Sequence, residues 1–355
     1  MDNAVTQHLM RPLNNSRGVA SVMVALTMTV LLAMAAATID IGHAVVARNE
    51  LQNAADAGAL AGARTLGIAY QGMSTAAMPT YTLTGGDRVA ITAAAQATGV
   101  LNAAAGVNVT VNAADIQIGL WDSATRTFTP TVNQPRAVRV ITRRDGTANG
   151  PISTFLASVV GLTSLNVTAA ATAEMTAVGK TAPGELNVPF GISQSFFTQF
   201  GCGDVIKFYP NDGTPSACAG WNTFDEAPAN ANTLKTIING MINGTYQAPA
   251  TESGFSLNFT NGNVASAFPP LINLYNAKKD ANGNWDVFVP VYKDNNCSAP
   301  SGALPIVGYS TARITTVLGA PQFKILATIQ CNVFDGNSGG GIPYGTFATI
   351  PGLVE

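Results

Sequence analysis

An uncharged, apolar run near the N-terminus constrains this chain more than any other feature. Residues 18–39, between Arg17 and Asp40, carry no charged side chain. An α-helix needs about 20 predominantly apolar residues to cross the hydrocarbon core of a bilayer. The sequence therefore predicts a transmembrane helix at 18–39.

The residues after this run predict that the same helix leaves the membrane and continues to about residue 66. Residues 40–66 contain no proline and only scattered glycines. Ala54, Gly58 and Gly62 recur every four residues and therefore lie on one face of the helix. Small residues at this spacing permit close approach of another backbone. We predict that these three residues are helix-packing positions, against the following sheet of the same chain in preference to a partner helix.

Charges on either side of the run predict its orientation. Arg11 and Arg17 precede it and Asp40 follows it. Basic residues near a span favour the cytoplasmic side. We expect residues 1–17 to be cytoplasmic and the bulk of the chain to be periplasmic or surface-exposed, on a single-pass protein of a bacterial inner membrane.

The length of the run favours a retained anchor over a cleaved signal. A secretory signal peptide has an apolar core of about 7–15 residues, and this run is longer. Cleavage of the type IV prepilin kind, after Gly18, would place Met23 where such pilins carry a glutamate. This departure argues against cleavage at Gly18.

Composition supports an exported, β-rich protein. Charged residues make up 11% of the chain, compared with about 25% in typical soluble domains. The net charge of −2 predicts no general attraction to nucleic acid.

Four cysteines indicate disulfides in the exported part. Cys202, Cys218, Cys297 and Cys331 all lie far downstream of the apolar run, and an even count in an oxidising compartment favours disulfide bonds. Three connectivities are possible. We predict nearest-neighbour pairing, Cys202 with Cys218 and Cys297 with Cys331, because each pair then lies within one local unit.

Patterning divides the remaining chain into a small α+β module at 67–176 and a β-rich exported domain at 186–355. A second alanine-rich helix is expected at 88–106, and β-branched alternation predicts strands within 107–121 and at 136–144. Pro151 is typical of a helix N-terminus. It predicts a helix at 151–161 whose apolar stripe consists of Phe155, Leu156, Val159 and Val160.

The N-terminal segment also resembles a known family. The resemblance rests on Gly18 after a basic residue, on the sequence Ile-Asp-Ile-Gly at 39–42, on Arg48, and on the block Leu-Gln-Asn-Ala-Ala-Asp-Ala at 51–57 followed by Ala-Leu-Ala-Gly-Ala at 59–63. Over these 45 or so positions the chain is similar to TadG-like proteins of the tight-adherence (Tad/Flp) pilus system.

The resemblance implies a structural role in pilus assembly and adherence at the bacterial envelope. The expected partners are the membrane and the TadE-like and TadF-like pilin-like subunits. The family has no catalytic residues to transfer, so the resemblance implies no enzyme activity, cofactor or metal. Some relatives include a von Willebrand A domain whose metal site begins D-x-S-x-S, and residues 212–216 match this motif poorly.

An anchored binding module is the alternative hypothesis. Trp221, Trp285, Tyr209 and Tyr292 would hold a sugar or surface ligand if they were exposed. Arg139 and Arg143 share one face of their predicted strand and would meet a phosphate or lipid headgroup, although a solvated sheet edge is the preferred interpretation.

A tethered hydrolase is the least favoured hypothesis. Asp204, Asp225 and Glu226 are the nearest candidates for a pair of catalytic carboxylates, and solvated loop acids are the preferred interpretation. The two histidines, His8 and His43, lie too close to the membrane segment to complete a triad in the exported domain.

Overall fold

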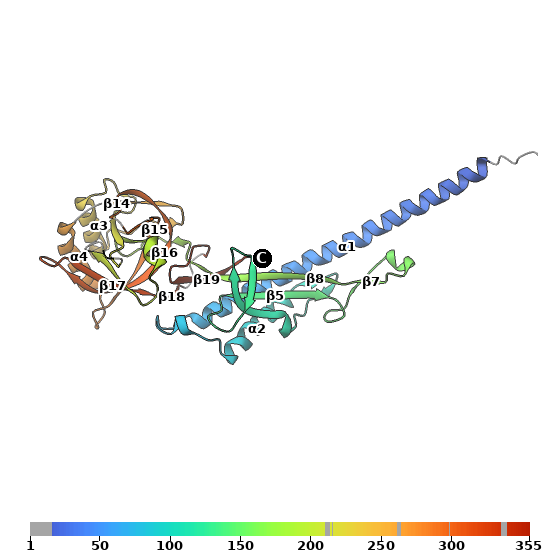
Figure 1. The fold of residues 1–355 in the computed structure, drawn as a ribbon, viewed down its shortest axis with the longest axis horizontal. Coiled ribbons are helices and arrows are strands. Elements are labelled where there is room, and N and C mark those ends of the chain that lie inside the picture. Colours follow the sequence, from blue (N-terminus) through green and yellow to red (C-terminus); the bar gives the residue numbers. More distant parts are fainter. Residues whose placement is uncertain (1–15, 210–213, 215, 261–263, 298, 335–338) are drawn as a thin grey trace, which may run out of the picture.

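The computed structural model describes residues 16–209, 214, 216–260, 264–297, 299–334 and 339–355. The fold is α+β, as expected. Figure 1 shows an elongated molecule in which a long helix projects from a small α+β module, and a β-rich head lies at the end farthest from the N-terminus. Residues 1–15, most of the predicted cytoplasmic segment, lie outside the described residues.

One helix, α1 (Ser16–Tyr70), runs through both the predicted span and the module. Its 55 residues correspond to about 80 Å at 1.5 Å per residue. The large apolar side chains as far as Val46 are exposed, whereas Ala47, Leu51 and Leu66 are fully buried. Beyond the helix end, Gly72 adopts a left-handed backbone conformation (φ 81°), which is typical of a helix C-terminus.

The module is a six-stranded sheet covered on one face by α1 and α2 (Gly85–Gly99). The strand order is β18-β19-β8-β5-β3-β4. The bounds are β3 (Ile116–Asp122), β4 (Thr127–Pro130), β5 (Ala137–Arg144), β8 (Val167–Ala177), β18 (Asn332–Phe334) and β19 (Thr346–Leu353). Thr84 begins α2 with a reciprocal capping box to Asp87, which satisfies free N–H groups of the first turn.

Small side chains on β8 allow α1 to lie close to the sheet. Ala169, Ala171 and Ala173 are buried in the same cluster as Leu51 and Ala55 of α1. Alternate residues of a strand point to the same face, so these alanines form one inward-facing row. The alanine-rich composition of helix and strand is therefore a packing feature of the module.

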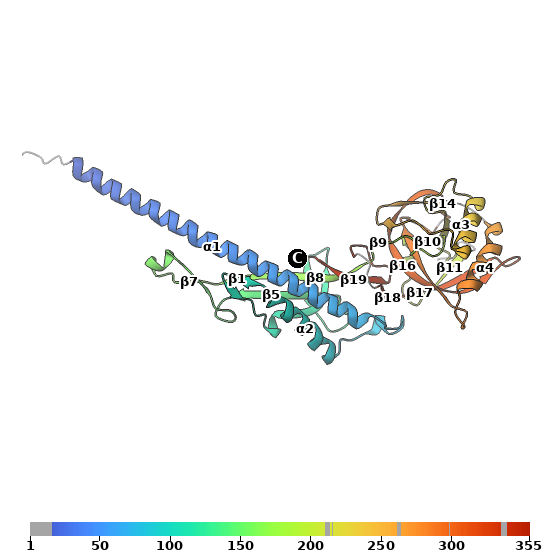
Figure 2. The ribbon, with the colours of Figure 1, turned by 180° about the vertical axis from the view of Figure 1, so that it is seen from behind.

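The head is a curved seven-stranded sheet with two helices against it. The strand order is β11-β17-β16-β14-β12-β10-β15, and an additional pairing of β15 with β16 closes β16, β14, β12, β10 and β15 into a ring. The bounds are β10 (Phe190–Ser193), β11 (Val205–Tyr209), β12 (Ala219–Asn222), β14 (Ser256–Thr260), β15 (Trp285–Tyr292), β16 (Gly302–Leu318) and β17 (Lys324–Gln330), with α3 (Ala231–Asn243) and α4 (Phe268–Lys278). Figure 2 shows both helices on the side away from the module.

Short elements complete the structure. Two-residue strands pair as β1 (Ala103–Ala104) with β2 (Val107–Asn108), β6 (Ile152–Ser153) with β7 (Ser164–Leu165), and β9 (Lys180–Thr181) with β13 (Thr251–Glu252). The 3-10 helices are η1 (Met78–Thr80), η2 (Ala113–Asp115), η3 (Ala157–Val160), η4 (Gln194–Thr198) and η5 (Ala265–Ala267).

The chain enters the head once and returns from it, which corrects the predicted domain at 186–355. After β17 the chain re-enters the module, where β19 pairs antiparallel with β8, as in Phe347 with Ala177. The last 20 or so residues therefore belong to the module sheet. A return of this kind depends on long-range strand pairing, and a linear division of the sequence could not reveal it.

The expected helix at 151–161 is wrong. Residues 151–165, hereafter the tip hairpin, form the strand pair β6–β7 with η3 between them. Phe155 and Val159 of the predicted stripe are 64% and 84% exposed. An isolated helix this short is marginal in water, and Phe155, Leu156 and Val159 gain little burial that would stabilise it.

Candidate functional site

The predicted small-residue face of α1 lies against its own module. A Cβ added at Gly62 would stand 2.8 Å from Val138 Cγ1, and one at Gly58 would stand 3.2 Å from the Ala95 carbonyl oxygen. Ala54 is fully buried. Gly58 and Gly62 thus lie against β5 and α2, and Ala54 is buried in the same core cluster as Val138 and Ala95. This face is not open to a partner helix.

Asp40, the charge that ends the apolar run, holds the tip hairpin against α1. Its carboxylate accepts hydrogen bonds from the backbone N–H groups of Phe155 (2.7 Å), Leu156 (3.1 Å) and Ala157 (2.6 Å). The ring of His43 makes an edge contact with Phe155, with centroids 5.4 Å apart. Asp40 therefore acts as a helix cap supplied by a distant segment, because it satisfies the free N–H groups at the start of η3. The sequence marks Asp40 as the end of the span and as part of the Ile-Asp-Ile-Gly block, but it does not reveal this capping contact.

Replacement of Asp40 by alanine is expected to release the tip hairpin from α1. Three backbone donors would lose their acceptor, and amide exchange across residues 154–162 should accelerate on the order of tenfold or more. Hydrogen–deuterium exchange of the detergent-solubilised full chain measures this. Asp56→Ala is the matched control, because the Asp56 carboxylate accepts from Gln52 on the same helix. Equal exchange in wild type and D40A would contradict the role assigned to Asp40.

Arg144 fixes the other end of the tip hairpin. This buried side chain donates from Nε to the carbonyl oxygen of Gly150 (2.8 Å) and from Nη1 to the carbonyl oxygen of Ala104. Asn149 donates from Nδ2 to the carbonyl oxygen of Arg143 (2.9 Å). The hairpin is therefore held both at its base, by the module, and at its tip, by α1.

The other arginines of β5 are engaged within the module. Arg143 pairs with Asp115 at 2.7 Å and Arg139 with Glu355 at 3.2 Å. The expectation that they lie at a solvated sheet edge is wrong, because β5 lies between β8 and β3 inside the sheet. Their ion pairs with protein carboxylates give no support to a phosphate or lipid-headgroup site.

All four cysteines form disulfides, but the predicted pairing is wrong. The bonds are Cys202–Cys331 and Cys218–Cys297, with Cα atoms 5.3 Å and 4.5 Å apart. Strand register explains the first bond. Val205 of β11 pairs antiparallel with Thr328 of β17, so residues three positions before one and three after the other come together.

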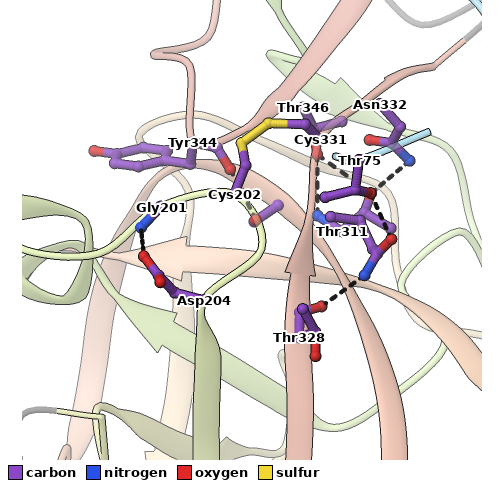
Figure 3. Close-up of a disulfide and its surroundings, with 12 residues drawn as sticks. Thr75, Gly201, Cys202, Asp204, Thr311, Thr328, Cys331, Asn332, Tyr344 and Thr346 are labelled. Carbon is purple, nitrogen blue, oxygen red and sulfur yellow. Dashed lines mark hydrogen bonds between the residues drawn. A yellow bond between two sulfur atoms is a disulfide. The ribbon is translucent and has the colours of Figure 1, made fainter. Parts of the chain in front are cut away.

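The Cys202–Cys331 bond lies where the chain returns from the head to the module (Figure 3). Thr75, in the segment between α1 and α2, donates a hydrogen bond from its hydroxyl to Gln330 Oε1 at 2.6 Å. On the other side, Thr311 of β16 donates its backbone N–H to Thr346 Oγ1 of β19 at 3.0 Å. Head and module are thus joined by a disulfide-braced return strand and by direct polar contacts.

Three of the four aromatic residues proposed for surface binding are in the head core. Trp221 and Trp285 are 3% and 5% exposed, and Tyr292 is fully buried. Tyr209 lies at the end of β11. The binding hypothesis required exposed rings, and burial of these three removes the observation that motivated it.

The candidate carboxylates take ordinary loop positions. Asp204 accepts the backbone N–H of Gly201 at 2.8 Å, which closes a local turn. Asp225 and Glu226 are exposed in the loop before α3. Within the described ranges no three His, Cys, Asp or Glu side chains are grouped closely enough to hold a metal ion. The weak metal motif at 212–216 lies largely outside those ranges.

In this fold, one helix provides both an apolar segment of membrane-spanning length and a core element of the α+β module. In the described part of the chain, α1 is the one helix long and apolar enough to cross a bilayer. Residues 18–65 match the model of a family described as putative Flp pilus-assembly TadE/G-like. The match confirms the resemblance of this N-terminal helix to TadG-like proteins of the Tad pilus system. No curated protein and no solved structure matches the chain.

Proposed function

We propose that this protein is a membrane-anchored, pilin-like structural component of Flp pilus assembly and adherence. The family match supports involvement in Flp pilus assembly. In the proposed arrangement α1 crosses the bacterial inner membrane once, the N-terminus is cytoplasmic, and the module and head are periplasmic or surface-exposed.

The observation that carries this proposal is the continuity of α1. The family match covers 18–65, and this segment is one uninterrupted helix. Its large apolar side chains are exposed as far as Val46, and one face from Ala47 onward is buried in the module core. No flexible linker separates the two halves. A tethered enzyme usually tolerates a flexible connection to its anchor. A helix that is part of both the anchor and the module instead holds the module in one position and orientation relative to the membrane segment.

The exposed apolar part of α1 is the surface through which we propose that TadE-like and TadF-like subunits associate. Its side chains, such as Val22, Leu26 and Leu32, are each about 60% exposed or more. In a bilayer, helix association depends on packing and on interhelical hydrogen bonds. We propose a structural role without catalysis, since no arrangement of side chains in the described structure suggests a reaction.

Deletion and complementation in the host test this proposal. Loss of the chain should abolish or strongly reduce surface pili and attachment, and the wild-type chain should restore them. A matched variant replaces residues 18–39 by an unrelated apolar helix of equal length. It should reach the membrane but restore pili poorly if the span makes specific contacts. Normal pili and attachment in the deletion strain would overturn the proposal.

The N-terminus of the mature protein distinguishes an assembly component of the membrane from a minor pilin of the filament. Intact mass of the protein from inner membrane and from sheared pili would show whether residues 1–18 remain. An uncut chain in the membrane fraction indicates an assembly component. A chain cut after Gly18 and recovered in filaments indicates a minor pilin and would contradict the predicted retention of the N-terminus.

A further inference from the structure

The tip hairpin is an uncharged, apolar projection. Residues 146–173 contain no charged side chain. Phe155, Leu156, Val159 and Leu162 are 64%, 41%, 84% and 49% exposed. Large apolar side chains gathered at one exposed tip are unfavourable in water and mark an interaction surface.

The position of the tip identifies the surface that covers it. Figures 1 and 2 show the hairpin with β7 extending beyond the sheet, alongside α1 and toward its N-terminal half. The three hydrogen bonds to Asp40 place η3 beside the residue that ends the uncharged run. Ala36, one turn nearer the N-terminus on the same face of α1, is partly covered, whereas the other alanines of residues 18–39 are exposed.

We propose that the tip hairpin inserts its apolar side chains into the interfacial layer of the same bilayer that α1 spans. This inference rests on the proposed anchoring by α1. Lipid is the fitting occupant because the tip lies beside the exposed apolar surface of α1, which continues past Asp40 to Val46, and because the tip lacks charge. Apolar faces of interfacial segments commonly enter about 5–10 Å into the headgroup and acyl boundary.

The contacts of Asp40 suit this location. A carboxylate at the edge of the hydrocarbon region is costly unless it is hydrogen-bonded. The backbone N–H groups of Phe155, Leu156 and Ala157 donate hydrogen bonds to the carboxylate there. Asp40 in turn provides these N–H groups with an acceptor, which lipid tails lack. The protein would then meet the membrane at two points, α1 and the hairpin, so that the rotation and tilt of α1 are restricted.

The test uses the full, disulfide-intact chain in phosphatidylcholine–phosphatidylglycerol vesicles, with one added cysteine carrying an environment-sensitive fluorophore. Val159→Cys reports on the tip and Leu32→Cys on the span. Leu101→Cys is the matched control, because Leu101 is an apolar residue of the same module that is 83% exposed, almost as much as Val159. Leu101 belongs to a segment farther along α1, where Glu50 accepts the backbone N–H of Ala105.

Brominated lipids and aqueous iodide then locate each probe. The probe at 159 should be quenched by lipids brominated near the headgroup end of the chain and protected from iodide. The probe at 32 should respond to deeply brominated lipids, and the probe at 101 to iodide alone. The inference would be overturned if the probe at 159 behaved like the probe at 101 or were shielded from both quenchers. In that case, lipid quenching of the probe at 32 would still support the membrane anchor. Absence of lipid quenching at 32 would instead contradict the anchor itself.

A charged side chain introduced at the tip provides a second, independent test of insertion. With the probe at Leu162→Cys, Val159→Asp should reduce brominated-lipid quenching at least twofold, and Leu101→Asp should leave it unchanged. Both substituted side chains are exposed, so neither variant should perturb the fold. Unchanged quenching in V159D would contradict insertion of the tip.

Discussion

Replacement of Gly62 by leucine is expected to destabilise the module by about 3 kcal/mol. A Cβ alone would stand 2.8 Å from Val138 Cγ1 and 3.6 Å from the Ala95 Cβ. The neighbouring sheet and α2 leave no room for three further carbon atoms, so α1 would have to move away from β5. Chemical or thermal unfolding of the full chain in detergent, followed by circular dichroism, measures the loss.

Gly42 provides the matched control on the same helix. A Cβ added there meets nothing within 4 Å, and alanine in a helix interior is favoured over glycine by about 0.5–1 kcal/mol. Gly42→Ala should therefore leave stability unchanged or raise it slightly. If Gly62→Leu unfolded like the wild type, the small-residue face would not be packed against the module, and a partner helix would again be the better interpretation.

Removal of the Cys202–Cys331 bond is the second change with a large expected effect. It links residues 129 positions apart, and loss of a native disulfide typically costs about 2–5 kcal/mol. In Cys202→Ser with Cys331→Ser, β18 and β19 should also exchange amide hydrogens faster, because the return to the module is no longer braced against β11.

The Cys218–Cys297 bond is the comparison within the same protein. It links residues 79 positions apart inside the head, so its removal should destabilise the head and leave exchange in β18 and β19 largely unchanged. Non-reducing peptide mapping should recover the peptides of Cys202 and Cys331 as one linked species. Recovery of Cys202 linked to Cys218 would contradict the structure and restore the nearest-neighbour prediction.

Features set by local patterning could be predicted from the sequence. The uncharged run at 18–39, its continuation as a helix, and the spacing of Ala54, Gly58 and Gly62 all depend on residues close together in the chain. The transmembrane-type helix, the α+β class and the disulfide-rich head follow from such patterns. Helix capping is equally local, since the capping box at the start of α2 is formed by Thr84 and Asp87, which are three residues apart.

The features that local patterns do not predict depend on contacts between distant residues. Local sequence patterns are sufficient to predict an apolar helix that continues past Asp40, a small α+β module and a β-rich region that contains the cysteines. Only the tertiary structure determined that Cys202 pairs with Cys331, that β19 returns to β8, and that Asp40 binds a hairpin 115 residues away. Strand register determines the disulfide pairing and the return of β19, and the Asp40 carboxylate accepts hydrogen bonds from distant backbone N–H groups. Neither kind of contact produces a periodic pattern in the sequence. For the same reason Pro151 and its apolar neighbours predicted a helix, whereas contacts with Asp40 and Arg144 shape a hairpin.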